Sequence, residues 1–223
     1  MVCPRTSVNQ YTDAAVTHFV SLIDPGEEEV INPPKSTQEK IQLIFSDLDD
    51  IEAGLPRFSK YPPPDTQHVH DLVEFGRSLG DLEDWGLLLH CEAGISRSTA
   101  AAITILTAAG YRPQAAFGFV RRVCPEMLPN RRILRLADEV LSTGGWLNHM
   151  AENHRRKAFK RAGYEDPIAV LKREAEEERQ ALASRSLLRR LLDVLPAGWR
   201  NMVGTGARMR AIKEKNGVLL KNV

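Results

Sequence analysis

The stretch that decides the fold is Gly86 to Ala109, GLLLHCEAGISRSTAAAITILTAA. It begins with an apolar run of strand length, Gly86 to His90, and passes through a short Gly-containing turn, Cys91 to Arg97. An Ala-rich run then starts at Ser98 and stops before Gly110, a residue that often ends helices. The stretch therefore predicts a buried strand, a tight turn and a helix in immediate succession.

Two apolar runs upstream, His18 to Ile23 and Ile41 to Phe45, predict further buried strands. A segment rich in Gly and Pro, Gly54 to Pro64, separates the second run from Asp65 to Leu79, whose apolar residues recur near helical spacing behind an Asp that could cap a helix. The order strand, loop, helix, strand is typical of a parallel sheet covered by helices. We therefore expect an α/β fold with a central, mostly parallel sheet of about four to five strands flanked by helices.

The sequence pattern changes near residue 145. Two more predicted helices, Pro113 to Val123 and Asn130 to Leu141, precede this point, and a long amphipathic stretch from Asp166 to about Leu195 follows it. We therefore divide the chain into a main domain, residues 1–145, and a helical, basic C-terminal extension of unknown role, residues 146–223.

Composition places the chain among ordinary globular proteins. The 223 residues are 43% hydrophobic and 26% charged, which is enough length and apolar content for a real core. The longest uncharged run, Ser98 to Tyr111, is shorter than the roughly 20 residues of a spanning helix, and the N-terminus lacks the pattern of a signal peptide. Cys3, Cys91 and Cys124 have neither disulfide nor zinc spacing, which fits a reducing compartment. We expect a cytoplasmic protein without membrane association.

Charge is distributed unevenly along the chain. Residues 148–223 hold 17 Lys and Arg against 9 Asp and Glu, whereas the preceding residues hold 13 against 20. A basic tail can contact nucleic acid, but the same excess arises on the solvated faces of long helices. We favour the second interpretation, so nucleic acid is an alternative partner and not the expected one.

The turn after the third apolar run is a candidate anion site. Ligands of open α/β sheets bind beyond the carboxyl ends of the strands, where backbone N–H groups and the positive end of a helix converge. The same donors would stabilise a thiolate on Cys91, which makes this side chain a candidate nucleophile. Arg97 offers a planar fork that can grip two phosphate oxygens, and Gly94 would let the backbone turn without a side chain crowding the ligand. The sequence therefore predicts a phosphate site with a nucleophilic cysteine.

These residues carry a family resemblance. His90 to Ser98, HCEAGISRS, resembles the HCX5R(S/T) signature of the cysteine-dependent protein tyrosine phosphatases, and its ending resembles the dual-specificity branch. Pro129 to Arg132 resembles the Pro-Asn helix start that follows this signature, and Phe45 to Leu48 resembles the Phe-x-Asp-Ile segment of a small bacterial tyrosine-phosphatase-like family. The resemblance extends over about Val16 to Gly145, so it implies that residues 1–145 are a phosphatase catalytic domain.

The resemblance implies a two-step hydrolysis without metal or cofactor. Cys91 would attack phosphorus and become phosphocysteine while Arg97 and the loop amides hold the phosphate oxygens. A general acid must protonate the leaving group, and the resemblance puts it on an Asp beside the pocket. Asp47, Asp49 and Asp50 are candidates, and we choose Asp47 because it matches the Phe-x-Asp pattern. Asp50 is the second choice, since the acid lies closer to the cysteine in many dual-specificity enzymes.

Supporting roles follow for the rest of the signature. Ser98 would donate a hydrogen bond to the sulfur and help the thiolate leave phosphocysteine, and His90 would support the loop from behind. Five positions would contact the phosphate mostly through their backbone amides: Glu92, Ala93, Gly94, Ile95 and Ser96.

The expected function is hydrolysis of phosphotyrosine in phosphorylated proteins, with phosphoserine and phosphothreonine as further substrates if specificity is dual. Two alternatives stay open. The same chemistry could act on an inositol phosphate, a nucleotide or an RNA 5′-phosphate, with the basic tail contacting nucleic acid. A catalytically inactive relative would instead recognise phosphoproteins as a binding module.

Overall fold

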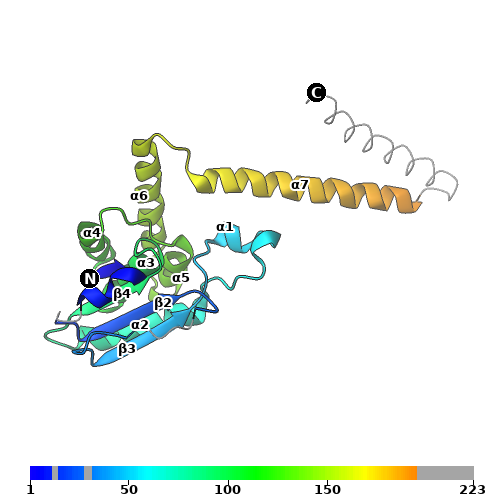
Figure 1. Ribbon diagram of the computed structural model, residues 1–223. Helices are drawn as coiled ribbons and strands as arrows, with labels where there is room; N and C mark the ends of the chain where they lie inside the picture. The colour runs from blue at the N-terminus through cyan, green and yellow to red at the C-terminus, as the bar shows by residue number, and fades with distance from the viewer. Residues whose placement is uncertain (12–14, 28–31, 195–223) are drawn as a thin grey trace, which may run out of the picture. The chain divides into compact units, whose positions relative to one another are not determined.

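The computed structural model describes residues 1–11, 15–27 and 32–194 (Figure 1). The elements, in chain order, are β1 (Val2–Pro4), η1 (Arg5–Tyr11), β2 (His18–Ile23), β3 (Glu39–Ile44), α1 (Asp50–Ala53), η2 (Pro56–Phe58), α2 (Thr66–Gly80), β4 (Leu87–Cys91), α3 (Arg97–Ala108), α4 (Pro113–Val123), α5 (Arg131–Leu141), α6 (Trp146–Ala162) and α7 (Pro167–Val194). The chain divides into two compact units, Met1–Leu171 and Lys172–Val223. Within these described ranges no helix combines the length and the apolar content that crossing a bilayer requires.

The four described strands form one parallel sheet in the order β1-β4-β2-β3. In the register of β4, Pro4 of β1 lies opposite Cys91, and Ser21 of β2 lies opposite His90. Because all strands run in one direction, their carboxyl ends meet at one edge of the sheet. The sheet confirms the α/β fold predicted from the sequence, and its four parallel strands fall within the expected number.

Both faces of the central strands are buried, by different parts of the chain. Val20 and Leu22 of β2 and Leu89 of β4 point into the larger core, which α2, α3, α4 and α5 cover. Phe19 and Leu88 point to the opposite face, into a smaller core covered by η1. Strands buried on both faces appear in a sequence as continuous apolar runs, which is why β2 and β4 were predictable.

Helix ends follow local capping signals. The Asp65 side chain accepts a hydrogen bond from the His68 N–H and caps α2. Asn130 Oδ1 accepts one from the Ile133 N–H at 3.0 Å and caps α5, and Pro113 begins α4. The predicted starts of α2, α4 and α5 are therefore confirmed to within one residue.

Two features differ from the expected elements. The third strand in chain order, β3, spans Glu39–Ile44 where the apolar run Ile41 to Phe45 was expected. Two short helices, α1 and η2, occupy a region in which we expected only a loop, because three or four residues are too few to show a helical period.

α6 packs on the first compact unit. Leu147 and Ala151 are buried in the larger core, and Asp138 of α5 accepts hydrogen bonds from the N–H groups of Leu147 and Asn148, each at 2.9 Å. The compact unit thus continues to Leu171, past the boundary expected at residue 145, because these α6 side chains need α5 to cover them. The division by function into residues 1–145 and 146–223 stays a prediction.

Candidate active site

The turn between β4 and α3 forms a cradle of backbone amides. Four of its carbonyl groups accept hydrogen bonds from elsewhere in the chain: Glu92 from the Arg5 N–H (3.3 Å), Gly94 from the Cys124 thiol (3.7 Å), Ile95 from the Leu128 N–H (2.8 Å) and Ser96 from the Asn130 N–H (3.3 Å). The described peptide bonds are all trans, so each carbonyl points away from the N–H of its own peptide group. The N–H groups of Ala93, Ile95, Ser96 and Arg97 therefore point inward, at the N-terminus of α3. Converging N–H groups at a helix N-terminus make an anion site.

The Cys91 sulfur lies at the base of this cradle. The Gly94 N–H donates to Cys91 Sγ at 3.2 Å, and Ser98 Oγ lies 3.2 Å from the same atom. Cys91 is 2% exposed and Ser98 is fully buried, so both donors act where water does not compete. These contacts hold the sulfur at the base of the cradle.

Gly94 makes a turn that favours glycine, as expected, and a second constraint also requires a glycine. Its φ of +75° is a left-handed conformation, and a β-carbon would lie 2.5 Å from Cys3 C and from Pro4 N. The backbone of β1 occupies the space that a side chain would need, and the role of Gly94 toward a ligand stays a prediction. The glycine therefore allows β1 to press against the cradle and fix its shape.

Arg97 is 3% exposed, and its guanidinium is held by the residues that directly follow β2 and β3. One terminal nitrogen donates to the Phe45 carbonyl at 2.9 Å, and the other donates to Asp24 Oδ2 at 2.8 Å. The buried Nε has no hydrogen-bond partner among the described residues and lies 3.9 Å from Asp47 Oδ2. Since an unpaired buried N–H is costly, this atom is available to an anion in the cradle.

Asp47 follows β3 and lies beside the cradle, although β2 separates β3 from β4 in the sheet. Its Oδ1 accepts hydrogen bonds from Ser96 Oγ and from Asn130 Nδ2, both at 2.8 Å. The side chain is 35% exposed, so its other oxygen can reach a bound molecule.

The other two candidate acids are engaged elsewhere. Asp49 accepts two hydrogen bonds from Arg131, at 2.8 and 3.0 Å. Asp50 accepts two from Arg135 and one from Arg132. Burial acts to raise the pKa of Asp50, but the hydrogen bonds and charges of Arg135 and Arg132 outweigh it, and the pKa is lowered. Asp50 is therefore unsuited to donate a proton near neutral pH.

His90 lies in β4 behind the cradle. Its Nε2 is 2.8 Å from Ser21 Oγ, and its ring stacks on Phe19 with centroids 5.5 Å apart. Burial, assisted by the charges of Arg5 and Arg97, lowers the pKa of His90 to about 4, despite a backbone contact with Cys91 that raises it. The imidazole is therefore neutral at physiological pH, and its supporting role stays a prediction.

The structure thus gathers Cys91, Arg97, Ser98 and Asp47 at one edge of the sheet. Sequence analysis missed Asp24, although an Asp directly after a buried strand was a usable signal. Asn130 was expected only at the start of a helix, whereas its side chain also donates to Asp47. Within the described part of the chain, no group of three or more His, Cys, Asp and Glu side chains could hold a metal ion.

Two proteins with assigned names are similar to this chain in sequence. No protein-family model matches the chain. A protein of Dictyostelium discoideum named as a dual specificity protein phosphatase is 27% identical over 130 residues, which are 58% of this chain and 52% of that protein. A protein of Invertebrate iridescent virus 6 named as a tyrosine phosphatase is 28% identical over 125 residues, 55% of this chain and 79% of that protein. The chain therefore spans about half the length of the first of these relatives.

Solved structures that were found similar to the chain include a mouse dual specificity phosphatase in complex with zinc tungstate. It aligns with a TM-score of 0.45 and 16% identity over 64% of this chain and 82% of the mouse chain. The two sequence matches confirm the resemblance predicted from residues 90–98. The chain is thus similar in sequence to proteins named as dual specificity and tyrosine phosphatases.

Proposed function

We propose that the protein is a cysteine-dependent phosphatase that removes phosphate from phosphotyrosine in proteins, and that it also accepts phosphoserine and phosphothreonine. The observation that carries this proposal is the position of the Cys91 sulfur. It lies under four inward N–H groups, within 3.2 Å of the Gly94 N–H and Ser98 Oγ. A nucleophile and an oxyanion site at one point are what phosphoryl transfer requires.

In the first step, the Cys91 thiolate forms a bond to phosphorus as the bond between phosphorus and the ester oxygen breaks. The loop amides and the Arg97 Nε stabilise the equatorial oxygens. Asp47 gives its proton to the leaving oxygen, so the alcohol departs neutral. The products are the dephosphorylated hydroxyl and phosphocysteine.

In the second step, the Asp47 carboxylate takes a proton from a water molecule that attacks phosphorus. The bond between sulfur and phosphorus breaks, and inorganic phosphate leaves with the restored thiolate behind it. Ser98 Oγ donates its hydrogen bond to the departing sulfur, which makes the thiolate a better leaving group.

The proposal is tested by hydrolysis of a small aryl phosphate, with chelator and a thiol reductant present, beside Cys91→Ser and Arg97→Ala. We expect turnover by the native protein that survives the chelator and is lost in both variants. If the native protein is inactive but still binds vanadate, a phosphate-binding module is favoured instead. If it hydrolyses nucleotides or inositol phosphates far faster than a phosphotyrosine peptide, the assignment to protein substrates is wrong.

A further inference from the structure

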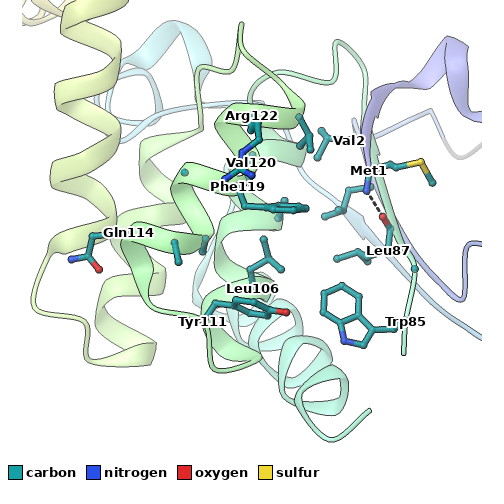
Figure 2. A pocket seen from close by; sticks show the side chains of 17 residues that line it. Met1, Val2, Trp85, Leu87, Leu106, Tyr111, Gln114, Phe119, Val120 and Arg122 are labelled. Atoms are coloured by element: carbon teal, nitrogen blue, oxygen red, sulfur yellow. Dashed lines mark hydrogen bonds between the residues drawn. The ribbon is translucent and has the colours of Figure 1, made fainter. Parts of the chain in front are cut away.

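A cavity of about 630 Å³ opens beside β4 (Figure 2). Its lining includes Trp85, Gly86 and Leu87 at the amino end of β4, whereas Cys91 is at the carboxyl end of that strand. No cradle residue takes part in the lining. A cavity of this size falls within the range of about 300 to 1,000 Å³ that small-molecule sites occupy.

The floor of the cavity is apolar and well packed. Leu87 and Leu89 supply the strand side, and Leu106 of α3 and Val120 of α4 supply the helix side. All four are at most 7% exposed, so the floor belongs to the core of the first compact unit. A floor of this kind binds alkyl or aromatic groups and offers no hydrogen bond through its side chains.

Large apolar side chains are exposed together at the rim of the cavity, whereas on most protein surfaces such side chains are scattered singly. Tyr111, Phe119 and Val123 are 51%, 50% and 46% exposed. Figure 2 shows the Phe119 and Tyr111 rings reaching from the helix side toward Leu87 and Trp85. Exposed apolar groups gathered around one opening mark an interaction site.

Gly118 keeps part of this opening free. It lies inside α4, where glycine is less stable than alanine, and it lines the cavity. No heavy atom lies within 4 Å of the place where its β-carbon would stand, so close packing does not require a glycine. The residue lowers helix stability without a packing reason, and what it provides is space in the cavity.

Arg122 carries the only charged side chain among the residues that line the cavity. It is exposed, and it forms no ion pair with the described residues. A guanidinium fork matches a carboxylate well. The Met1 ammonium also lines the cavity, but it donates to the Leu87 carbonyl and burial lowers its pKa, so Arg122 is the cation left to meet a charge on the ligand. A neutral apolar ligand would leave Arg122 unused.

We propose that this cavity is a binding site for a medium-chain fatty acid, with the alkyl chain against the apolar walls and the carboxylate at Arg122. The site is independent of the proposed phosphatase activity. The expected ligand has one negative charge at one end and an apolar body.

The test is titration of the full-length protein with octanoate, decanoate and laurate below their micelle concentrations, followed by calorimetry and by tryptophan fluorescence. Trp85→Phe identifies the part of the fluorescence signal that comes from the cavity. We expect saturable binding of one molecule per chain, with affinity rising about tenfold for each two methylene groups added. Decanol, which has the same chain without the charge, is expected to bind about tenfold more weakly than decanoate.

Matched variants assign the site. Arg122→Gln is expected to reduce decanoate affinity to that of decanol, whereas Arg121→Gln, a neighbour on the same helix that does not line the cavity, keeps native affinity. Gly118→Leu is expected to block decanoate binding and to raise the thermal midpoint of unfolding. Gly118→Ala is expected to keep most of the decanoate affinity.

Three results would overturn the proposal. The first is that decanoate shows no saturable binding. The second is that Arg122→Gln and Arg121→Gln lose the same amount of decanoate affinity, and the third is that Gly118→Leu binds decanoate with native affinity. If Gly118→Leu does not fold, the two arginine variants and the comparison of decanoate with decanol decide the question.

Discussion

At the scale of single residues, the two oxygens of Asp47 are not equivalent. Oδ1 accepts hydrogen bonds from Ser96 and Asn130, which leaves Oδ2, 3.9 Å from Arg97 Nε, as the oxygen that can face a bound substrate. We predict that Asp47→Asn lowers kcat for phenyl phosphate by about 10² to 10³. The loss for p-nitrophenyl phosphate is expected to be much smaller, because that leaving group departs without a proton.

The measurement is kcat across a series of aryl phosphates whose phenols differ in pKa. Asp50→Asn is the control, since Arg132 and Arg135 hold that carboxylate away from proton transfer. A steep dependence on the leaving group in Asp50→Asn, with a flat one in Asp47→Asn, would reverse the assignment.

Asp24 places a negative charge next to the arginine that is meant to hold phosphate. An anion in the cradle is repelled by this carboxylate, whereas an amide could still accept the hydrogen bond from Arg97. We predict that Asp24→Asn tightens inhibition by inorganic phosphate by about fivefold. Inhibition constants at low and high salt would check this, with the difference shrinking at high salt. Weaker inhibition in the variant would mean that the charge of Asp24 orients Arg97 for binding.

His90 makes stability depend on pH in acid solution. Its pKa falls from 6.5 to about 4 in the folded protein, so the unfolded chain binds more protons between these values. Stability is therefore complete above about pH 6.5 and declines as pH falls toward 4, with about 2 kcal/mol lost by pH 5. Urea unfolding at pH 7.5 and pH 5 should show this loss, and His90→Gln should lose about 2 kcal/mol less over the same interval. Equal losses in both proteins would assign the acid sensitivity to other groups.

At the scale of elements, ion pairs join the segment that carries Asp47 to α5. Arg131 and Asp49 form a buried pair, with side chains 11% and 7% exposed, whereas Arg135 and Asp50 are both 36% exposed. We predict that Arg131→Ala costs about 3 kcal/mol, because it leaves a buried carboxylate unpaired. Arg135→Ala, its matched surface control, should cost less than about 1 kcal/mol. Chemical denaturation measures both, and a larger cost for Arg135→Ala would contradict the ranking.

At the scale of the whole molecule, we expect a shortened chain to stay folded if it ends where the compact unit ends, at residue 171. The boundary implied by the family resemblance, residue 145, removes part of that unit. A chain ending at residue 171 keeps α6, whereas one ending at residue 145 loses the buried Leu147 and two donors to Asp138. We predict that residues 1–171 fold with a clear cooperative transition and that residues 1–145 are less stable by at least about 3 kcal/mol. Equal stability of the two chains would support the boundary at residue 145.

Much of this architecture was readable in the sequence, for physical reasons. The central strands are continuous apolar runs, and the cradle is one contiguous segment between a strand and a helix. The side chains around it come from distant parts of the chain. Asp24 meets Arg97 across 73 positions and Asn130 meets Asp47 across 83, contacts that depend on strand order and on how α5 packs. No local pattern encodes these distances.

The carbonyl groups of the cradle are anchored by Arg5, Cys124, Leu128 and Asn130, which lie on both sides of it in the chain. Thr99 Oγ1 also donates to the Ile95 and Ser96 carbonyls from within α3, at 2.7 and 2.9 Å, but the four distant contacts are complete only after the N-terminal strand and the segment before α5 have both docked. A partly folded chain would therefore contain the nucleophile without the anion site. Recovery of turnover during refolding should lag behind recovery of the helical circular dichroism signal. Enzymatic activity would then measure the formation of the last tertiary contacts.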